Sequence, residues 1–302
     1  MAKIRTNSGF DSAKNLFHNK SGKLGWDNTE MRDRKAEART RTIEDLQKLP
    51  NKPAKIRTLT LCGENPVHEQ MLLDSTDLTD RIEELVCLEG DPKVHDAARR
   101  RRRAMPKNWR DKITLIQAED KQVLLATSGY KSKGVSTSPR HKARTSLGFD
   151  LIWLDWMNSF GKGIDQTVAL LCENISVFER AWRNGNPGLL YLTLACCKEE
   201  KADLKTLHLA LSAFDRNYET NGMASDSYRV RYYGLGALIN HHLQLRGAEG
   251  IPTHGLFYRE QRTHAMTMFF AGFRVVPTSH GGKTLPRFPR PEFLGITDPS
   301  ER

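Results

Sequence analysis

The sequence predicts an α/β protein whose mostly parallel sheet has helices on both faces. From residue 55 onward, short apolar runs alternate with helix-forming segments, and parallel strands need such crossover connections. Residues 149–158 (FDLIWLDWMN) form an apolar run that is too short for an ordinary helix and is typical of a buried central strand. Near the C-terminus, two strand-like runs follow each other so closely that they can only pair antiparallel.

The alternation of apolar and helix-forming segments predicts a definite order of elements. Pro66 suits the first turn of a helix, where its missing N–H costs nothing, and Gly185 with Pro187 ends a later helix. The expected strands are 56–62, 84–88, 113–116, 149–155, 189–196, 255–259 and 265–276. The expected helices are 66–75, 94–105, 121–126, 163–184 and two within 199–246.

Residues 1–54 form a basic N-terminal arm ahead of the main domain, which we expect at 55–276. Residues 1–55 hold 13 Lys or Arg against 7 Asp or Glu, so they can bury little apolar surface alone. Residues 29–49 are rich in helix formers, and Pro50 and Pro53 would stop such a helix. The helix could pack, contact nucleic acid or stand as a solvated charged helix. The tail at 277–302 is expected to be extended.

The chain is basic, with 47 Lys or Arg against 36 Asp or Glu and a net charge of +11, which favours acidic partners such as nucleic acid. Two clusters concentrate the charge at the amino-terminal edge of the predicted sheet. A mobile loop at 131–148 contains no acid. The predicted nucleic-acid-binding residues are Arg99, Arg100, Arg101, Arg102 and Arg103 in one cluster and Lys131, Lys133, Arg140, Lys142 and Arg144 in the other.

The cysteines and histidines predict no metal site or disulfide. The cysteines lie in apolar runs without zinc spacing, which indicates reduced thiols in a cytoplasmic setting. No run of 18 apolar residues and no signal peptide is seen, so a soluble protein is expected. A mitochondrial presequence stays open as the alternative, because residues 1–26 contain a single acid, Asp11. A P-loop motif is absent.

Asp155 is the first candidate for a functional residue. It ends the apolar run that predicts the central strand, and open α/β sheets bind ligands in the crevice at the carboxyl ends of their strands. A carboxylate at this place could orient or deprotonate a bound group.

Four motifs resemble Rossmann-like (class I) S-adenosylmethionine (SAM) dependent methyltransferases over residues 55–276. They are LTLCGEN at 59–65, VCLEGDP at 86–92, LIQAED at 115–120 and DLIWLDWM at 150–157. The resemblance implies a seven-stranded sheet of order 3-2-1-4-5-7-6 with strand 7 antiparallel, and SAM as the cofactor.

The resemblance also implies roles for single residues. Glu89, beside Gly90 and Asp91, would hold the ribose hydroxyls, since a carboxylate can accept both hydrogen bonds. Glu119 or Asp120 would lie near the adenine, and Asp155 near the methionine part or the reacting centre. The first loop would cradle the cofactor with Cys62, Gly63, Glu64 and Asn65, and Glu64 could contact the methionine amino group.

Two departures from the family pattern leave two functions open. The first loop has only one glycine, Gly63, and Asp155-Trp156-Met157-Asn158 replaces the Asn/Asp-Pro-Pro-aromatic motif of enzymes that methylate base amino groups. The chain is therefore either a SAM-dependent methyltransferase that acts on or near nucleic acid, or a catalytically inactive protein of that fold that binds nucleic acid or serves as an interaction module.

Overall fold

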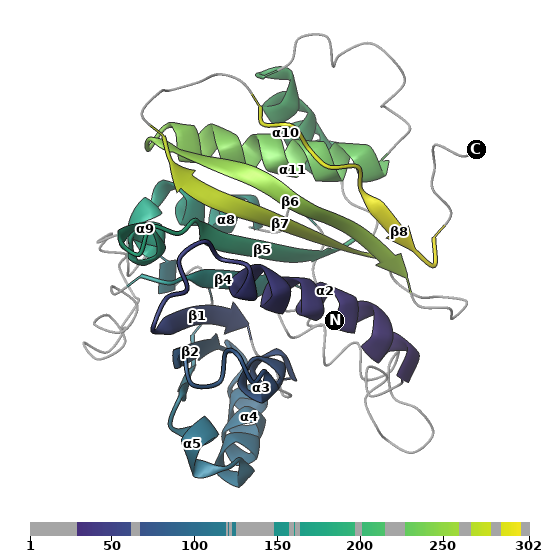
Figure 1. Cartoon of the computed structure of the whole chain (residues 1–302). Coiled ribbons are helices and arrows are strands. Elements are labelled where there is room, and N and C mark those ends of the chain that lie inside the picture. The colour runs from purple at the N-terminus through teal and green to yellow at the C-terminus, as the bar shows by residue number, and fades with distance from the viewer. Residues whose placement is uncertain are drawn as a thin grey trace.

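The computed structural model describes residues 29–61, 67–118, 120, 123–124, 148–156, 160, 164–196, 201–214, 227–259, 267–278 and 285–296. Within these residues the strands form one sheet of order β3-β2-β1-β4-β5-β7-β6-β8, drawn in Figure 1. Strand β7 is antiparallel to both of its neighbours, and every other pairing is parallel. The predicted order 3-2-1-4-5-7-6 with an antiparallel strand 7 is confirmed.

The described strands are β1 Ile56–Leu61, β2 Ile82–Leu88, β3 Ile113–Ile116, β4 Leu151–Asp155, β5 Gly188–Ala195, β6 Ala248–Arg259, β7 Thr267–Pro277 and β8 Glu292–Leu294. The helices are α2 Thr29–Gln47, α3 Val67–Asp74, α4 Pro92–Ala104, α5 Lys107–Arg110, α8 Ile164–Glu173, α9 Glu179–Arg183, α10 Lys201–Ser212 and α11 Ser227–Gln244, with the 3-10 helix η3 Ile175–Phe178. Helical backbone is also described at residues 120, 123 and 124, inside or next to the expected helix 121–126.

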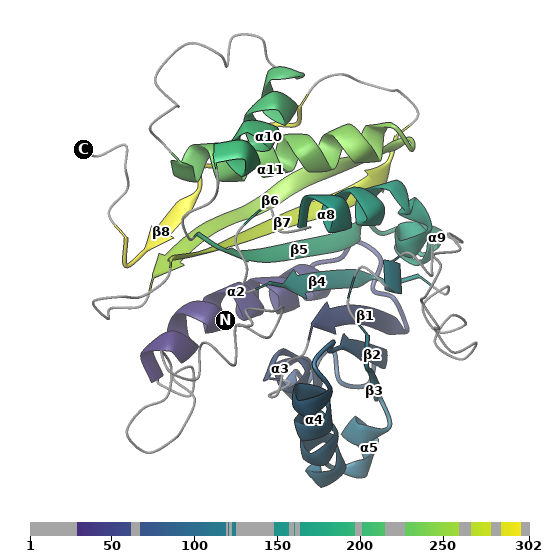
Figure 2. The same ribbon diagram turned by 180° about the vertical axis from the view of Figure 1, so that it is seen from behind.

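Helices cover both faces of the sheet, as predicted. Helices α8 and α11 contribute to the hydrophobic core on one face, whereas α2, α3 and α4 contribute to the core on the other. Figures 1 and 2 show these two layers from opposite sides. None of the helices in the described part of the chain is long and apolar enough to span a membrane.

Strand β4 lies in the middle of this arrangement, between β1 and β5. Leu151 and Trp153 belong to the core on the α2 side, and Ile152 and Leu154 belong to the core on the α8 side. Side chains alternate along a strand, so an apolar residue at every position is what a strand buried on both faces requires. The interpretation of this stretch as a central buried strand is confirmed for Leu151–Asp155, whereas residues 157 and 158 lie outside the described residues.

The sheet has one strand more than predicted. The tail was expected to be merely extended, but β8 pairs in parallel with β6. Phe293 of β8 stacks on Phe257 of β6 with ring centroids 5.4 Å apart. Three residues between prolines and glycines give too little pattern for a strand to be predicted, and the aromatic contact that fixes β8 comes from a distant part of the chain.

Strand β6 begins at Ala248, seven residues before the predicted start. Gly250 and Pro252 make this stretch look like a turn. The pairing with β7 is irregular between Pro252 and His254, which is how a strand tolerates a residue that has no N–H to donate. The first half of β6 was therefore not predicted, because its Gly250 and Pro252 are typical of a turn.

The continuous helix expected at 163–184 is interrupted after Glu173. Asn174 adopts a non-helical conformation (φ −94°, ψ 60°), and its side-chain oxygen accepts a hydrogen bond from the Ser176 hydroxyl at 2.7 Å. Short polar side chains compete in this way with helical hydrogen bonding. The segment is thus split into α8, η3 and α9.

The helix expected at 29–49 exists as α2, but it packs on the sheet. Ala38 and Leu46 are fully buried, and Leu49 is 5% exposed. The Tyr191 hydroxyl of β5 donates to Asp45 at 2.7 Å, and Arg41 pairs with Glu292 of β8 at 2.7 Å. Of the roles left open for this helix, the structure shows packing, for the part from Lys35 to Leu49.

Candidate functional site

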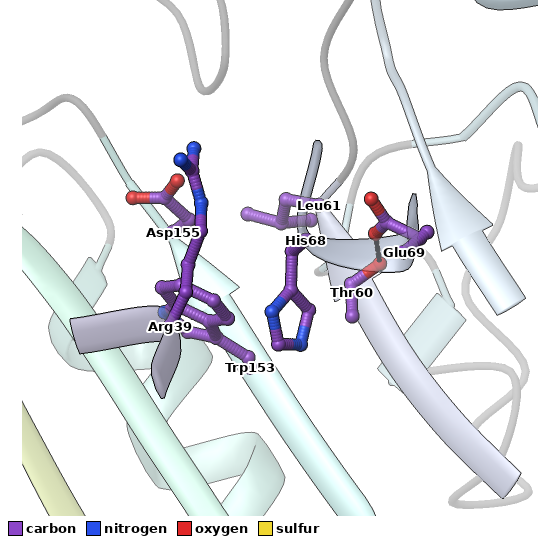
Figure 3. A pocket seen from close by; sticks show the side chains of 7 residues that line it. All are labelled: Arg39, Thr60, Leu61, His68, Glu69, Trp153 and Asp155. Atoms are coloured by element: carbon purple, nitrogen blue, oxygen red, sulfur yellow. Dashed lines mark hydrogen bonds between the residues drawn. The ribbon is translucent and has the colours of Figure 1, made fainter. Parts of the chain in front are cut away.

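A small polar cavity lies at the carboxyl ends of β1 and β4. These are the strands between which the strand order reverses, and such switch points are where open α/β sheets bind ligands. The cavity measures about 30 Å³, room for one or two water molecules. Figure 3 shows its lining, which is Arg39, Thr60, Leu61, His68, Glu69, Trp153 and Asp155.

Asp155 is the last residue of β4, as the sequence predicted, and it is paired with a residue of α2. Its Oδ2 lies 2.6 Å from Nζ of Lys35, and the two side chains are 17% and 11% exposed. Burial lowers the pKa of the Lys35 ammonium, while the charge of Asp155 opposes that shift. The structure thus places a largely buried ion pair at the switch point.

Arg39 follows Lys35 by one helical turn, so both side chains lie on the same face of α2. Arg39 lines the cavity, and in Figure 3 its side chain extends on the same side as Asp155. Its positive charge is also a cause of the lowered pKa values of Lys35 and His68. Helix α2 therefore brings two cations to the carboxyl edge of the sheet.

His68 lies in the first turn of α3 and is 6% exposed. Its ring meets Trp153 edge to face, with centroids 4.3 Å apart. Neither ring nitrogen has a hydrogen-bond partner among the described residues. Burial, and then the charges of Arg39 and Lys35, hold the pKa of His68 well below its usual value, so the ring is neutral near pH 7.

Glu69 follows His68 and is 1% exposed. The hydroxyl of Thr60, from β1, donates a hydrogen bond to its carboxyl group. Burial raises the pKa of Glu69, although the hydrogen bond from Thr60 opposes the shift. The cavity therefore has a carboxyl group with a raised proton affinity on one side and the Lys35–Asp155 ion pair on the other.

Tyr258 of β6 is 5% exposed, and its hydroxyl has no hydrogen-bond partner among the described residues. Burial raises its pKa well above the ordinary value, and the negative charge of Asp155 adds to the shift. The phenol stays protonated and can donate to a polar group.

Glu89 follows β2 at the same edge of the sheet and is 2% exposed. Its Oε1 accepts a hydrogen bond from the backbone N–H of Asp91 at 2.8 Å. Asp91 caps α4, with its own Oδ1 accepting from the N–H of Lys93 at 2.8 Å. The turn through Gly90 therefore fixes the direction of the Glu89 carboxylate.

Asp120 is 6% exposed and accepts a hydrogen bond from the indole N–H of Trp156. This bond joins the segment after β3 to the segment after β4. Glu119 and the first-loop residues Cys62, Gly63, Glu64 and Asn65 lie outside the described residues.

The predicted arginine cluster lies on α4, and the structure does not bring it to the crevice. Arg99, Arg100, Arg101 and Arg103 are exposed, whereas Arg102 is half-buried and donates to the backbone carbonyl of Arg110 at 2.7 Å. The predicted basic residues of the loop, Lys131, Lys133, Arg140, Lys142 and Arg144, lie outside the described residues.

A second hollow lies at the amino-terminal edge, beside the start of β1. It measures about 500 Å³ and is lined by Ala54, Lys55, Arg180, Arg183 and Asn184. Buried Asp150 accepts from Arg180 Nε at 2.9 Å, and Glu83 accepts from its Nη2 at 2.7 Å. Lys55 and Arg183 are exposed and have no acidic partner among the described residues.

Sequence reasoning missed Lys35, Arg39, His68 and Glu69. Ala38 and Arg39 follow Lys35 by three and four positions, so the three residues lie on one side of the expected helix. This spacing was a signal that this side could pack. His68 and Glu69 open the helix that follows the first loop, so they could have been placed at the carboxyl edge.

Among the described residues, no group of three or more His, Cys, Asp or Glu is placed to hold a metal ion.

No protein-family model matches this sequence. No curated protein matches it either. Among solved structures, a putative sarcosine dimethylglycine methyltransferase from Galdieria sulphuraria is similar, with 14% identity and a TM-score of 0.47 over 87% of this chain and 98% of that one. Magnesium protoporphyrin IX methyltransferase from Synechocystis PCC 6803, solved with bound SAM, has 11% identity and a TM-score of 0.44 over 90% of this chain and 94% of that one.

The fold is assigned from the sheet itself. The order 3-2-1-4-5-7-6, with helices on both faces and an antiparallel strand 7, is that of Rossmann-like class I SAM-dependent methyltransferases. The chain has this fold, with β8 added at the edge of the sheet beyond β6.

Proposed function

We propose that this protein is a SAM-dependent methyltransferase that binds its cofactor at the carboxyl edge of the sheet. The observation that supports this most directly is the row of acids at that edge. Glu89 and Asp120 follow β2 and β3, and Asp155 ends β4, so all three lie at the carboxyl edge, where the switch point between β1 and β4 is also found. Fold alone does not fix function, so the proposal depends on these side chains.

The residues present fit SAM at two places. Glu89 has a carboxylate held in a fixed direction by the Asp91 N–H, as needed to accept hydrogen bonds from two ribose hydroxyls. Asp120 is held by Trp156 on the β3 side, where the adenine would lie. The backbone and side chains of residues 62–65 would complete the cradle, with Gly63 allowing close approach.

SAM, when bound, supplies an electrophilic methyl group. The protein's part in such a transfer is to position the two reactants and to exclude water. Asp155, paired with Lys35 at the end of β4, would lie beside the methionine part of SAM.

Calorimetry with SAM tests this proposal. Glu89→Gln keeps an oxygen for the Asp91 N–H but removes the charge, so SAM affinity should fall by about 1.5–3 kcal/mol, the range for hydrogen bonds to charged groups. Asp77→Asn, the same kind of change at an exposed position before β2, is the matched control and should bind SAM as the wild type does. Absence of SAM binding by wild-type protein at millimolar ligand would refute the proposal.

A second function, nucleic-acid binding without catalysis, is favoured by one observation. Exposed arginines of α4 and the hollow lined by Lys55, Arg180 and Arg183 lie away from the carboxyl edge. Such cations can bind phosphate backbones by releasing counterions. The basic loop at 131–144 would add to this surface, and the protein would bind nucleic acid whether or not the SAM site is active.

A further inference from the structure

We propose that α2 completes the cofactor site, with Arg39 and Lys35 binding the α-carboxylate of the amino-acid end of SAM while Asp155 binds its α-ammonium group. This inference rests on the proposed function, because it concerns how the same cofactor is held. It assigns a binding role to a helix that the sequence placed in a basic arm.

The first argument is the position of α2. Buried Ala38 and Leu46 and the bonds of Asp45 hold the helix against the sheet. Lys35 and Arg39 then lie one turn apart at the switch point, facing the end of β4. Two cations from one rigid element suit a carboxylate, which has two oxygens to offer.

The second argument is the mixture of charges. The cavity has Arg39 on the α2 side and the Asp155 carboxylate, paired with Lys35, at the end of β4. The neutral ring of His68 lies between these groups and Glu69 (Figure 3). An amino-acid group is a zwitterion, with an ammonium and a carboxylate on one carbon atom. Opposite charges in adjacent positions of a site match that pattern, whereas a simple anion or cation would satisfy only one side.

The third argument is the Lys35–Asp155 ion pair, in which each side chain occupies the position that a group of opposite charge on the ligand would take. Pulling the two side chains apart would break a largely buried ion pair, and that is costly. A zwitterion removes the cost, because its ammonium replaces Lys35 on Asp155 and its carboxylate replaces Asp155 on Lys35. Each buried charge keeps a partner throughout the exchange.

The cavity indicates where the entering group begins to bind. Its volume of about 30 Å³ holds one or two waters, so the group enters by displacing water and by a shift of Lys35. His68, 6% exposed and with no hydrogen-bond partner for either ring nitrogen among the described residues, offers the group a further polar contact. Glu64, which the resemblance places near the ammonium, lies outside the described residues and is not needed for this argument.

Two adenosine ligands separate the amino-acid end from the rest of the cofactor. S-adenosylhomocysteine contains the amino-acid group, and 5′-methylthioadenosine has the same adenosine and thioether without it. Calorimetry should show that wild-type protein binds S-adenosylhomocysteine more tightly. In Arg39→Gln, affinity for S-adenosylhomocysteine should fall about ten- to hundredfold, while affinity for methylthioadenosine stays within about twofold.

Arg41→Gln is the matched control, since it is the same change on the same helix. Arg41 faces Glu37 and Glu292, away from Asp155, so neither affinity should change beyond about twofold. Unchanged binding of methylthioadenosine also shows that the Arg39 variant is folded.

The outcomes separate this inference from the proposed function. If wild-type protein binds neither ligand, the proposed function fails. If it binds both equally, or if Arg39→Gln weakens both to the same degree, SAM binding stands but α2 does not hold the amino-acid end. If Arg41→Gln reproduces the loss, the effect comes from the docking of α2, and the inference is overturned.

Discussion

Asp45 bonds the C-terminal end of α2 to the sheet. It is 6% exposed, it accepts a hydrogen bond from Tyr191, and its Oδ2 lies 2.8 Å from Nε2 of His254. Burial alone would raise the pKa of this carboxyl group, but the contacts with His254 and Tyr191 outweigh burial and lower it. The ionised form of Asp45 is therefore the form that stabilises the fold.

The lowered pKa predicts how stability depends on pH. Because the folded-state pKa of Asp45 is below its unfolded value of about 3.9, its contribution is present above that value and is lost as pH falls through the folded pKa. Asp45→Asn should lower the free energy of unfolding by about 1.5–3 kcal/mol at pH 7, and the difference from wild type should shrink below about pH 4. Urea unfolding at several pH values measures this.

An exposed acid provides the comparison for Asp45. Asp80→Asn, in the segment before β2, should change the free energy of unfolding by less than about 0.5 kcal/mol at any of these pH values. A difference between Asp45→Asn and wild type that is equally large at pH 3 and pH 7 would show that the charge of Asp45 contributes nothing.

At the site, the sequence predicted the acidic residues at the ends of strands, but it did not predict the residues that helices α2 and α3 contribute. Asp155 ends an apolar run, and that alone places it at the carboxyl edge. Lys35 lies 120 positions earlier in a segment where charges outnumber apolar residues, which is the pattern of a solvated helix. Only the docking of α2 buries Lys35 beside Asp155, and docking depends on contacts with β5, β6 and β8 that no local pattern contains.

Strand β4 is the element whose packing can be tested most directly. Leu154 is fully buried in the core on the α8 side. Leu154→Ala should lower the free energy of unfolding by about 2–5 kcal/mol, because the cavity left in a well-packed core closes only partly. Denaturant unfolding, with an unchanged slope, would measure the loss.

Leu209 of α10 gives the matched control, since it is the same residue type at 61% exposure. Leu209→Ala should cost less than about 0.5 kcal/mol. A near-neutral result for Leu154→Ala would mean that β4 is not a buried central strand.

Elements with long apolar runs were predictable, and elements defined by their partners were not. Residues 189–195 form such a run and residues 56–61 are rich in β-forming residues, so β1 and β5 were predicted to within one residue at each end. The first half of β6 contains Gly250 and Pro252, which indicate a turn, and becomes a strand because β7 offers a continuous partner. In the same way, β8 forms because it pairs with the edge of β6 and because Phe293 stacks on Phe257.

At the scale of the whole molecule, the charge distribution predicts a nucleic-acid-binding surface around α4. Replacing four exposed arginines, Arg99, Arg100, Arg101 and Arg103, by Ser should weaken duplex binding and reduce the log–log dependence of affinity on salt by up to about 3.6 units. SAM affinity should stay unchanged, because these side chains lie on α4 away from the carboxyl edge. Titrations at several salt concentrations measure the slope.

A second variant with the same loss of charge separates a local surface from net charge. It replaces exposed residues on or near α10, α11 and β8, which Figure 1 shows at the far end of the molecule from α4. The substitutions are Lys205→Ser, Arg246→Ser, Arg287→Ser and Arg290→Ser. Equal weakening by both variants would indicate attraction by overall charge, and no weakening by either would remove α4 from the surface.

The contact between Arg41 and Glu292 joins residues 251 positions apart, and this imposes a delay during synthesis. A ribosome adds about 5–20 residues per second, so α2 waits for roughly ten seconds to a minute before β8 is made. For part of that time, until β5 and β6 are made, its sheet-facing side lacks these partners on the nascent chain. A helix with few apolar residues tolerates such a wait without aggregating, whereas a more apolar one would attract other chains before its own partners emerged.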